Sequence, residues 1–202
     1  METSTIFQGL PRLAMTLGAL HRGAGSTARL GVVLLSILLP CVAASPALAG
    51  DATENDVTIA ARTLGFMEKP LNGAVRVGIV YAPANLQSSR DANALQKFMT
   101  NGLAVGGISM NPVMVPVDSV GGAKVDLLFL AAGVGAYASK AGEAGQAKHI
   151  PCITLDIDQV RAGNCAIGIT SQPRVEILVN RDAAARSGVN FAGAFKMLIK
   201  EF

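Results

Sequence analysis

Apolar and polar positions along the chain predict strands and helices that follow one another in turn. Near-continuous apolar runs, typical of strands covered on both faces of a sheet, occupy residues 74–81, 125–131 and 152–156. Segments predicted to be helical precede or separate these runs at residues 55–66, 89–103 and 133–148. Because strands that alternate with helices form parallel sheets with helices on both faces, the pattern predicts an α/β fold.

The remaining predicted strands indicate which strands lie at the edges of this sheet. Residues 108–117 predict a strand at or near an edge, because Pro112 and Pro116 cannot donate ladder hydrogen bonds. Strands at 165–170 and 174–179 are separated by only three residues, which predicts an antiparallel hairpin. The predicted fold is therefore a three-layer α/β domain with a mostly parallel sheet, helices on both faces and a C-terminal antiparallel edge hairpin.

Two helices are expected after the hairpin. Asn180 is placed to cap the first, which Gly188 ends, and Asn190 is placed to cap the second. The second is predicted from apolar residues at helical spacing, namely Phe191, Ala194, Phe195, Leu198 and Ile199. We expect this last helix to cover the sheet.

The first 49 residues have the pattern of a cleaved signal peptide. Arginines precede an apolar run of 14 residues at 30–43, which is shorter than the ~20 residues that a membrane-spanning helix needs. Small residues at Ala47 and Ala49 then predict cleavage between Ala49 and Gly50. An uncleaved anchor and lipidation of Cys41 are alternatives, disfavoured by Pro40. Translation could begin at Met1 or at Met15 without changing the mature protein.

Removal of this segment changes what the composition implies. The chain has 202 residues, 17 basic and 14 acidic, a net charge of +3 and a mean hydropathy of +0.42. Residues 1–49 carry three of the basic residues and one acidic residue, so the predicted mature domain, 50–202, has 153 residues and a net charge of +1. A single exported domain that neither spans a membrane nor binds nucleic acid is expected.

Two cysteines, Cys152 and Cys165, stay in the predicted mature chain, at the starts of consecutive predicted strands. In an oxidising compartment such a pair is expected to form a disulfide. Two buried free thiols and a redox-sensing role are the alternatives. The spacing differs from C-x-x-C, which excludes a thioredoxin-like motif.

One segment resembles a cofactor motif. Gly133 and Gly135 begin a G-x-G-x-x-A sequence between a predicted strand and a helix, and Asp156 lies 23 residues after Gly133, where a ribose-binding acid would stand. So much Gly and Ala makes a chance match easy. We therefore treat these three residues only as weak candidates for a dinucleotide site and expect no cofactor.

Other catalytic patterns are missing from the mature sequence. His149 is its only histidine, so a histidine-based metal cluster cannot form, and no G-x-S-x-G elbow is present. Asp126, Asp156 and Asp158 flank predicted strands, where caps and solvated turns are the ordinary explanation. We expect no enzyme activity.

A family resemblance rests on the C-terminal half. The segments are VDLLFL at 125–130, IPCITLD at 150–156, GNCAIGI at 163–169, and VEILVNRDAA with SGV at 175–184 and 187–189. In this order they resemble the YfiR/HmsC family of periplasmic regulators, and the resemblance extends over about Val57–Phe202. Two departures are Met67, which follows Phe66 where the family commonly has an aromatic residue, and Asn164 in place of the second glycine of a pair.

The resemblance implies a non-enzymatic regulator that represses an inner-membrane diguanylate cyclase, and so cyclic di-GMP signalling and biofilm formation, by binding the periplasmic portion of the enzyme. It also implies that a redox signal could enter at the disulfide. The edge hairpin could support strand addition or a homodimer. The alternative is a single-lobed periplasmic solute-binding module, although such proteins usually close two lobes on a ligand.

Overall fold

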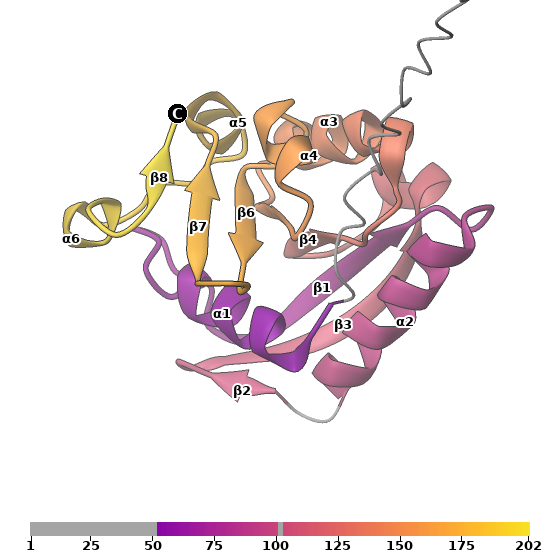
Figure 1. Cartoon of the computed structure of the whole chain (residues 1–202), viewed down its shortest axis with the longest axis horizontal. Coiled ribbons are helices and arrows are strands. Elements are labelled where there is room, and N and C mark those ends of the chain that lie inside the picture. The colour runs from indigo at the N-terminus through magenta and orange to yellow at the C-terminus, as the bar shows by residue number, and fades with distance from the viewer. Residues whose placement is uncertain (1–51, 101–102) are drawn as a thin grey trace, which may run out of the picture. The chain divides into compact units, whose positions relative to one another are not determined.

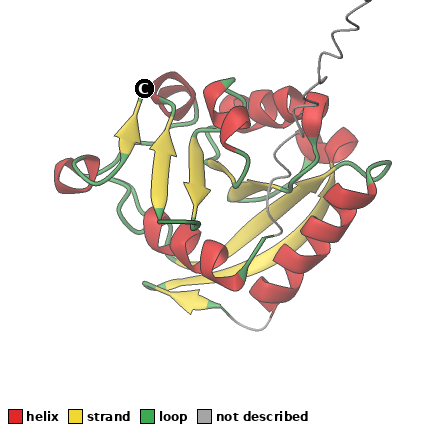
Figure 2. Ribbon diagram, viewed as in Figure 1, coloured by secondary structure: helices red, strands yellow, loops and turns green. Residues whose placement is uncertain are grey.

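The computed structural model describes residues 52–100 and 103–202 (Figures 1 and 2). The predicted signal peptide, its cleavage point at Ala49 and Gly50, and Cys41 lie outside the described residues. Eight strands form one sheet in the order β2-β3-β1-β4-β5-β6-β7-β8. They are β1 Gly73–Tyr81, β2 Ala104–Val105, β3 Ile108–Pro116, β4 Leu127–Leu130, β5 Cys152–Thr154, β6 Ile167–Thr170, β7 Glu176–Val179 and β8 Lys200–Glu201.

The helices pack on both faces of this sheet, as predicted. α1 and α2 contact each other, and α2 packs on β1 and β3, while α3 packs on β4 and α4 on β5 and β6. The helices are α1 Glu54–Leu64, α2 Leu86–Thr100, α3 Ala138–Lys148, α4 Ile157–Arg161, α5 Arg181–Arg186 and α6 Gly193–Lys196, with 3-10 turns η1 Val117–Gly122 and η2 Gly135–Tyr137. The α/β fold with a mostly parallel sheet is therefore confirmed.

Parallel pairing of five strands forms the centre of the fold. β3, β1, β4, β5 and β6 are parallel, and β1 aligns Val77 with Leu127 and Ile79 with Phe129 of β4. All four of these side chains are fully buried. Apolar side chains on successive residues suit strands that are covered on both faces, which explains the unbroken apolar runs.

The prolines of β3 lie where the prediction placed them. β2 pairs only with Ile108 and Ser109, so the outer edge of β3 is open at Pro112 and Pro116. An open edge tolerates residues that cannot donate a backbone hydrogen bond.

The C-terminal part corrects two predictions. β6 and β7 form the expected antiparallel pair, but β8 pairs in parallel with β7 and is the outer strand (Figure 1). The predicted last helix is replaced by the four-residue α6 and by β8. The reason is tertiary: the N–H of Phe202 donates to Val179 O at 3.2 Å, and the N–H of Arg181 donates to Phe202 O at 3.0 Å. Pairing with β7 thus competes successfully with the helical pattern.

Candidate functional site

The order of the parallel strands reverses at β1. From β1 the chain goes outward to β3 and then returns to β4 on the other side of β1. In open α/β sheets, ligands bind outside the carboxyl ends of the strands at such a switch point. In this chain the segments at that place are residues 82–85, after β1, and residues 131–135, after β4.

Side chains of the protein, those of Asp91 and Asn85, occupy this switch point. The buried carboxylate of Asp91, on α2, accepts hydrogen bonds from the N–H of Ala132 at 2.7 Å and from the N–H of Ala52 at 3.1 Å. Beside it, the Asn85 amide donates to Gly133 O at 2.9 Å. Because Ala52 is itself buried, the segment that leads into α1 covers part of the crevice.

The glycine motif lies in the loop after β4. Gly133 and Gly135 have φ values of 73° and 56°, in the left-handed region that favours glycine. A Cβ on Gly133 would lie 3.1 Å from the amide nitrogen of Asn85, whereas a Cβ on Gly135 would meet nothing within 4 Å. The close approach at Gly133 therefore serves a contact within the protein.

Asp156 follows β5 and caps α4. One carboxylate oxygen accepts the N–H of Asp158 at 3.1 Å, and the other accepts the Gln159 amide at 3.4 Å. Capping was the ordinary explanation for this acid, and it accounts for both oxygens. The sequence did not predict α4 itself, because five residues are too few for a helical pattern to be recognised.

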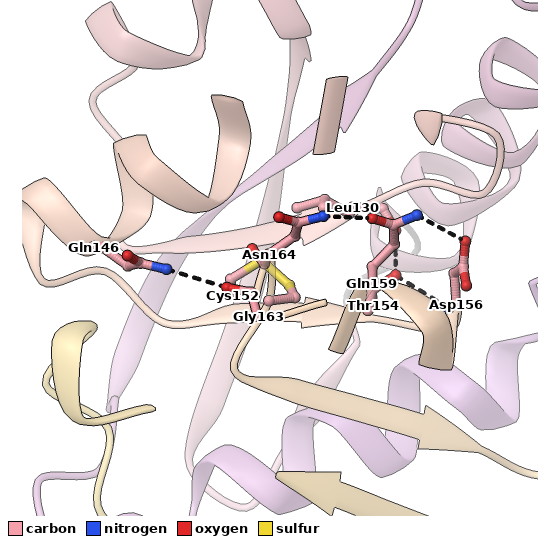
Figure 3. The surroundings of a disulfide bond; sticks show 9 residues. Leu130, Gln146, Cys152, Thr154, Asp156, Gln159, Gly163 and Asn164 are labelled. Atoms are coloured by element: carbon pink, nitrogen blue, oxygen red, sulfur yellow. Dashed lines mark hydrogen bonds between the residues drawn. A yellow bond between two sulfur atoms is a disulfide. The ribbon is translucent and has the colours of Figure 1, made fainter. Parts of the chain in front are cut away.

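The expected disulfide joins Cys152 and Cys165 (Figure 3). The Cα atoms are 5.0 Å apart, and both residues are buried. Next to it, Gln146 of α3 donates to Gly163 O at 3.3 Å, and Asn164 donates to the Gln159 side chain at 2.9 Å. The disulfide thus lies in a hydrogen-bonded loop that ties α3 to α4.

His149 and Asp126 lie near the opposite, amino-terminal edge of the parallel strands. Both residues line an open cavity of about 520 Å³. The Nδ1 atom of His149 is 3.1 Å from Arg186 O. Asp126 forms a two-pronged ion pair with Arg76, and hydrogen bonds from the Arg76 side chain and N–H lower the pKa of this carboxyl. These contacts orient His149 and Asp126 at the surface. They do not place a nucleophile next to a base.

A smaller cavity opens at the carboxyl edge, beside β5 and β6. Its volume is about 230 Å³, and Leu155 and Ile169 give it an apolar side. The polar lining consists of Thr53, Asp56, Thr170, Ser171 and Gln172. Asp56 is committed to the N-terminus of α1, where it accepts the N–H and hydroxyl of Thr53 at 2.8 and 2.7 Å.

Two of the most exposed apolar side chains of the described residues, Met197 and Leu198, lie near the C-terminal edge of the sheet. Val175, Met197 and Leu198 are 54%, 83% and 76% exposed, and we name them the C-terminal apolar surface. Val175 and Leu198 line the same shallow groove of about 200 Å³. At this groove Glu176 pairs with Arg174 at 2.6 Å and with Lys200 at 2.8 Å. An apolar centre beside charged pairs is the arrangement found in protein–protein interfaces.

Sequence reasoning missed this surface. It assigned Leu198 to the buried face of a helix, together with Phe195 and Ile199, and gave Met197 no role. In the structure Phe195 and Ile199 are buried, but α6 ends at Lys196 and Leu198, which follows it, is exposed. The only available signal was the two consecutive apolar residues at 197 and 198, which one face of a helix cannot bury together.

The described residues provide neither a cluster of metal-binding side chains nor a helix suited to a membrane. Residues 52–100 and 103–202 contain no group of three or more His, Cys, Asp or Glu side chains that could hold a metal ion. Over the same ranges, no helix combines the length and the apolar character needed to cross a membrane.

No protein-family model and no curated protein sequence matches this chain. The solved structures that share the fold at low identity include the following three. A conserved domain protein from Vibrio cholerae is 13% identical with a TM-score of 0.52, over 73% of this chain and 59% of that chain. A ligand-free, open substrate binding protein from Clostridium difficile is 13% identical with a TM-score of 0.52, over 75% and 59%.

The third is described as an ABC domain in complex with L-Trp from Streptococcus pneumonia. It is 10% identical with a TM-score of 0.51, over 73% of this chain and 60% of that chain. This chain thus spans about 60% of the length of the three structures. At such identities the likeness shows a shared α/β fold.

Proposed function

We propose that this protein is a non-enzymatic periplasmic regulator that binds another protein through the C-terminal apolar surface. The observation that carries the proposal is the exposure of Val175 and Leu198 in the groove that holds the ion pairs of Glu176, together with the exposure of the adjacent Met197. Apolar side chains that gather on one exposed face are typical of docking sites. The resemblance to YfiR/HmsC regulators names the partner: the periplasmic portion of an inner-membrane diguanylate cyclase.

The other parts of the domain support a binding role. The switch point, where a ligand or cofactor would be expected, is partly covered by Ala52, which Asp91 holds in place. Gly133 is used to approach Asn85, and Asp156 is used to cap α4. A surface contact with a protein leaves all of these arrangements intact.

The test measures binding of the purified mature domain to the purified periplasmic portions of the diguanylate cyclases encoded in the same genome. We expect Leu198→Asp to abolish binding to one of them. Leu86→Asp is the matched control, because Leu86 is 73% exposed but lies on α2. Deletion of the gene should raise cyclic di-GMP and biofilm. Unchanged cyclic di-GMP, or equal effects of the two substitutions, would contradict the proposal.

A second candidate function is solute binding by one lobe. It is favoured by the cavity of about 230 Å³ at the carboxyl edge, with its hydroxyl, amide and carboxylate lining. Two of the similar structures are described as a substrate binding protein and as a complex with L-Trp. A thermal-shift screen against amino acids, sugars and oxyanions tests this candidate. A saturable shift that Asp56→Asn and Thr170→Val each reduce would support it, and the absence of any shift would exclude it.

A further inference from the structure

An open cavity lined by two cationic side chains is unrelated to either candidate function. It has a volume of about 470 Å³ and lies between α5 and the segment that carries α6 and β8. Buried apolar residues contribute to its lining, namely Val179, Ala184, Val189 and Phe191. Its size falls within the range of about 300 to 1,000 Å³ that is usual for small-molecule sites.

Two cations line this cavity without a charged partner. Arg181, the first residue of α5, and Lys196, the last residue of α6, both contribute to the lining. Neither forms an ion pair with any residue that the structure describes, whereas five other cationic side chains do. Glu201 also lines the cavity and likewise has no such pair. The charged lining therefore carries a net charge of +1.

The geometry points to a site for a small organic monocarboxylate with an apolar body. Arginine presents paired donors that match a carboxylate, and lysine adds a point charge. The apolar residues of the lining suit a hydrocarbon or aromatic group. The carboxylate of Glu201 disfavours a second negative charge, so a monoanion fits better than phosphate or a dicarboxylate.

This site also connects the C-terminal segment to the rest of the domain. Lys196 immediately precedes Met197, and Glu201 belongs to the two-residue strand β8. A carboxylate held between Arg181 and Lys196 would tie α6 to α5. Ligand binding is therefore expected to slow hydrogen exchange in residues 193–202 more than elsewhere.

The experiment titrates octanoate and 3-phenylpropionate into the mature domain by calorimetry, with octanol and inorganic phosphate as comparisons. We expect saturable binding of at least one carboxylate and no binding of octanol or phosphate. Arg181→Gln and Lys196→Gln should each weaken the affinity about tenfold, the effect of losing one charge-assisted hydrogen bond.

Two further variants separate this site from general charge effects. Ala185→Met should abolish binding while leaving both cations in place, because Ala185 is an exposed helical residue that lines the cavity. Arg90→Gln, an exposed arginine on α2, should leave the affinity unchanged. The proposal is overturned if neither carboxylate binds, if octanol binds as well as octanoate, or if Ala185→Met binds normally. None of these results depends on whether a protein partner exists.

Discussion

The carboxylate of Asp91 lies 2.7 Å from the backbone nitrogen of Ala132, and this contact joins α2 to the loop after β4. The same carboxylate accepts the N–H of Ala52 at 3.1 Å, so it also fixes the start of the described chain. A buried charge is tolerated only when hydrogen bonds compensate for its lost hydration. Asp91 therefore holds the loop after β4 and the segment before α1 together at the switch point.

Substitution of Asp91 should be costly. Asp91→Asn keeps the shape but loses the charge and brings an NH₂ group toward a backbone donor, so we expect a loss of about 2 to 4 kcal/mol in the free energy of unfolding. Urea denaturation of the mature domain measures the loss. The control is Asp182→Asn, an exposed acid on α5, which should change stability by less than about 0.5 kcal/mol. Equal stability of the two variants would refute a structural role for Asp91.

A second test concerns the close approach of α3 to the disulfide loop. A Cβ added to the buried Gly142 would collide with the carbonyl oxygen of Asn164, a backbone atom that cannot rotate away. Gly142→Ala should therefore destabilise the domain by about 1 to 3 kcal/mol, although alanine normally favours helices. Gly121→Ala is the control, since nothing lies within 4 Å of its added Cβ. Thermal denaturation distinguishes the two, and a stabilised Gly142→Ala would show that the helix shifts freely.

The third test concerns the disulfide. Cys152 and Cys165 are separated by 13 residues, and closing a loop of this size stabilises a domain by about 3 kcal/mol. We expect the double variant Cys152→Ala/Cys165→Ala to lose that amount. In wild-type protein, both cysteines should be alkylated under denaturing conditions only after reduction, as intact mass would show. Alkylation without a reductant would contradict the disulfide.

The central sheet was predictable from sequence because its signal is local. The buried runs that became β1, β4 and β5 are apolar at consecutive positions, and a strand covered on both faces requires that pattern. Likewise, Asn180 caps α5 as expected, with its side chain accepting the N–H of Ala183 at 3.0 Å. Such features depend on neighbours a few residues away.

The C-terminal segment and the candidate sites were not predictable for the opposite reason. β8 exists because Phe202 finds backbone partners at Val179 and Arg181, contacts that no local pattern records. The lining of the cavity of about 470 Å³ likewise combines Arg181 with Lys196, which no spacing rule connects. The sequence also did not reveal the structural role of Gly133, one of the weak cofactor candidates. That role is a contact with Asn85, which lies 48 residues earlier.

The last prediction concerns pH and the ion pair between Arg76 and Asp126. Hydrogen bonds from the Arg76 side chain and N–H hold the pKa of Asp126 below its ordinary value. A carboxyl whose pKa is lowered by folding adds stability above its unfolded pKa of about 3.9, and this stability is lost as the pH falls through the folded pKa. Arg76→Gln should therefore raise the pKa of Asp126, which NMR titration of its carboxyl carbon measures.

The effect on stability should be small and sensitive to salt. The side chains of Arg76 and Asp126 are 53% and 36% exposed, so water and ions screen the pair. Wild type and Arg76→Gln should differ at neutral pH in low salt and converge both in high salt and at a pH below the folded pKa. The matched control is Arg161→Gln, because Arg161 pairs at 3.0 Å with Asp158, which is 83% exposed. A pKa of Asp126 that is the same in wild type and Arg76→Gln would mean that the pair does not persist in solution.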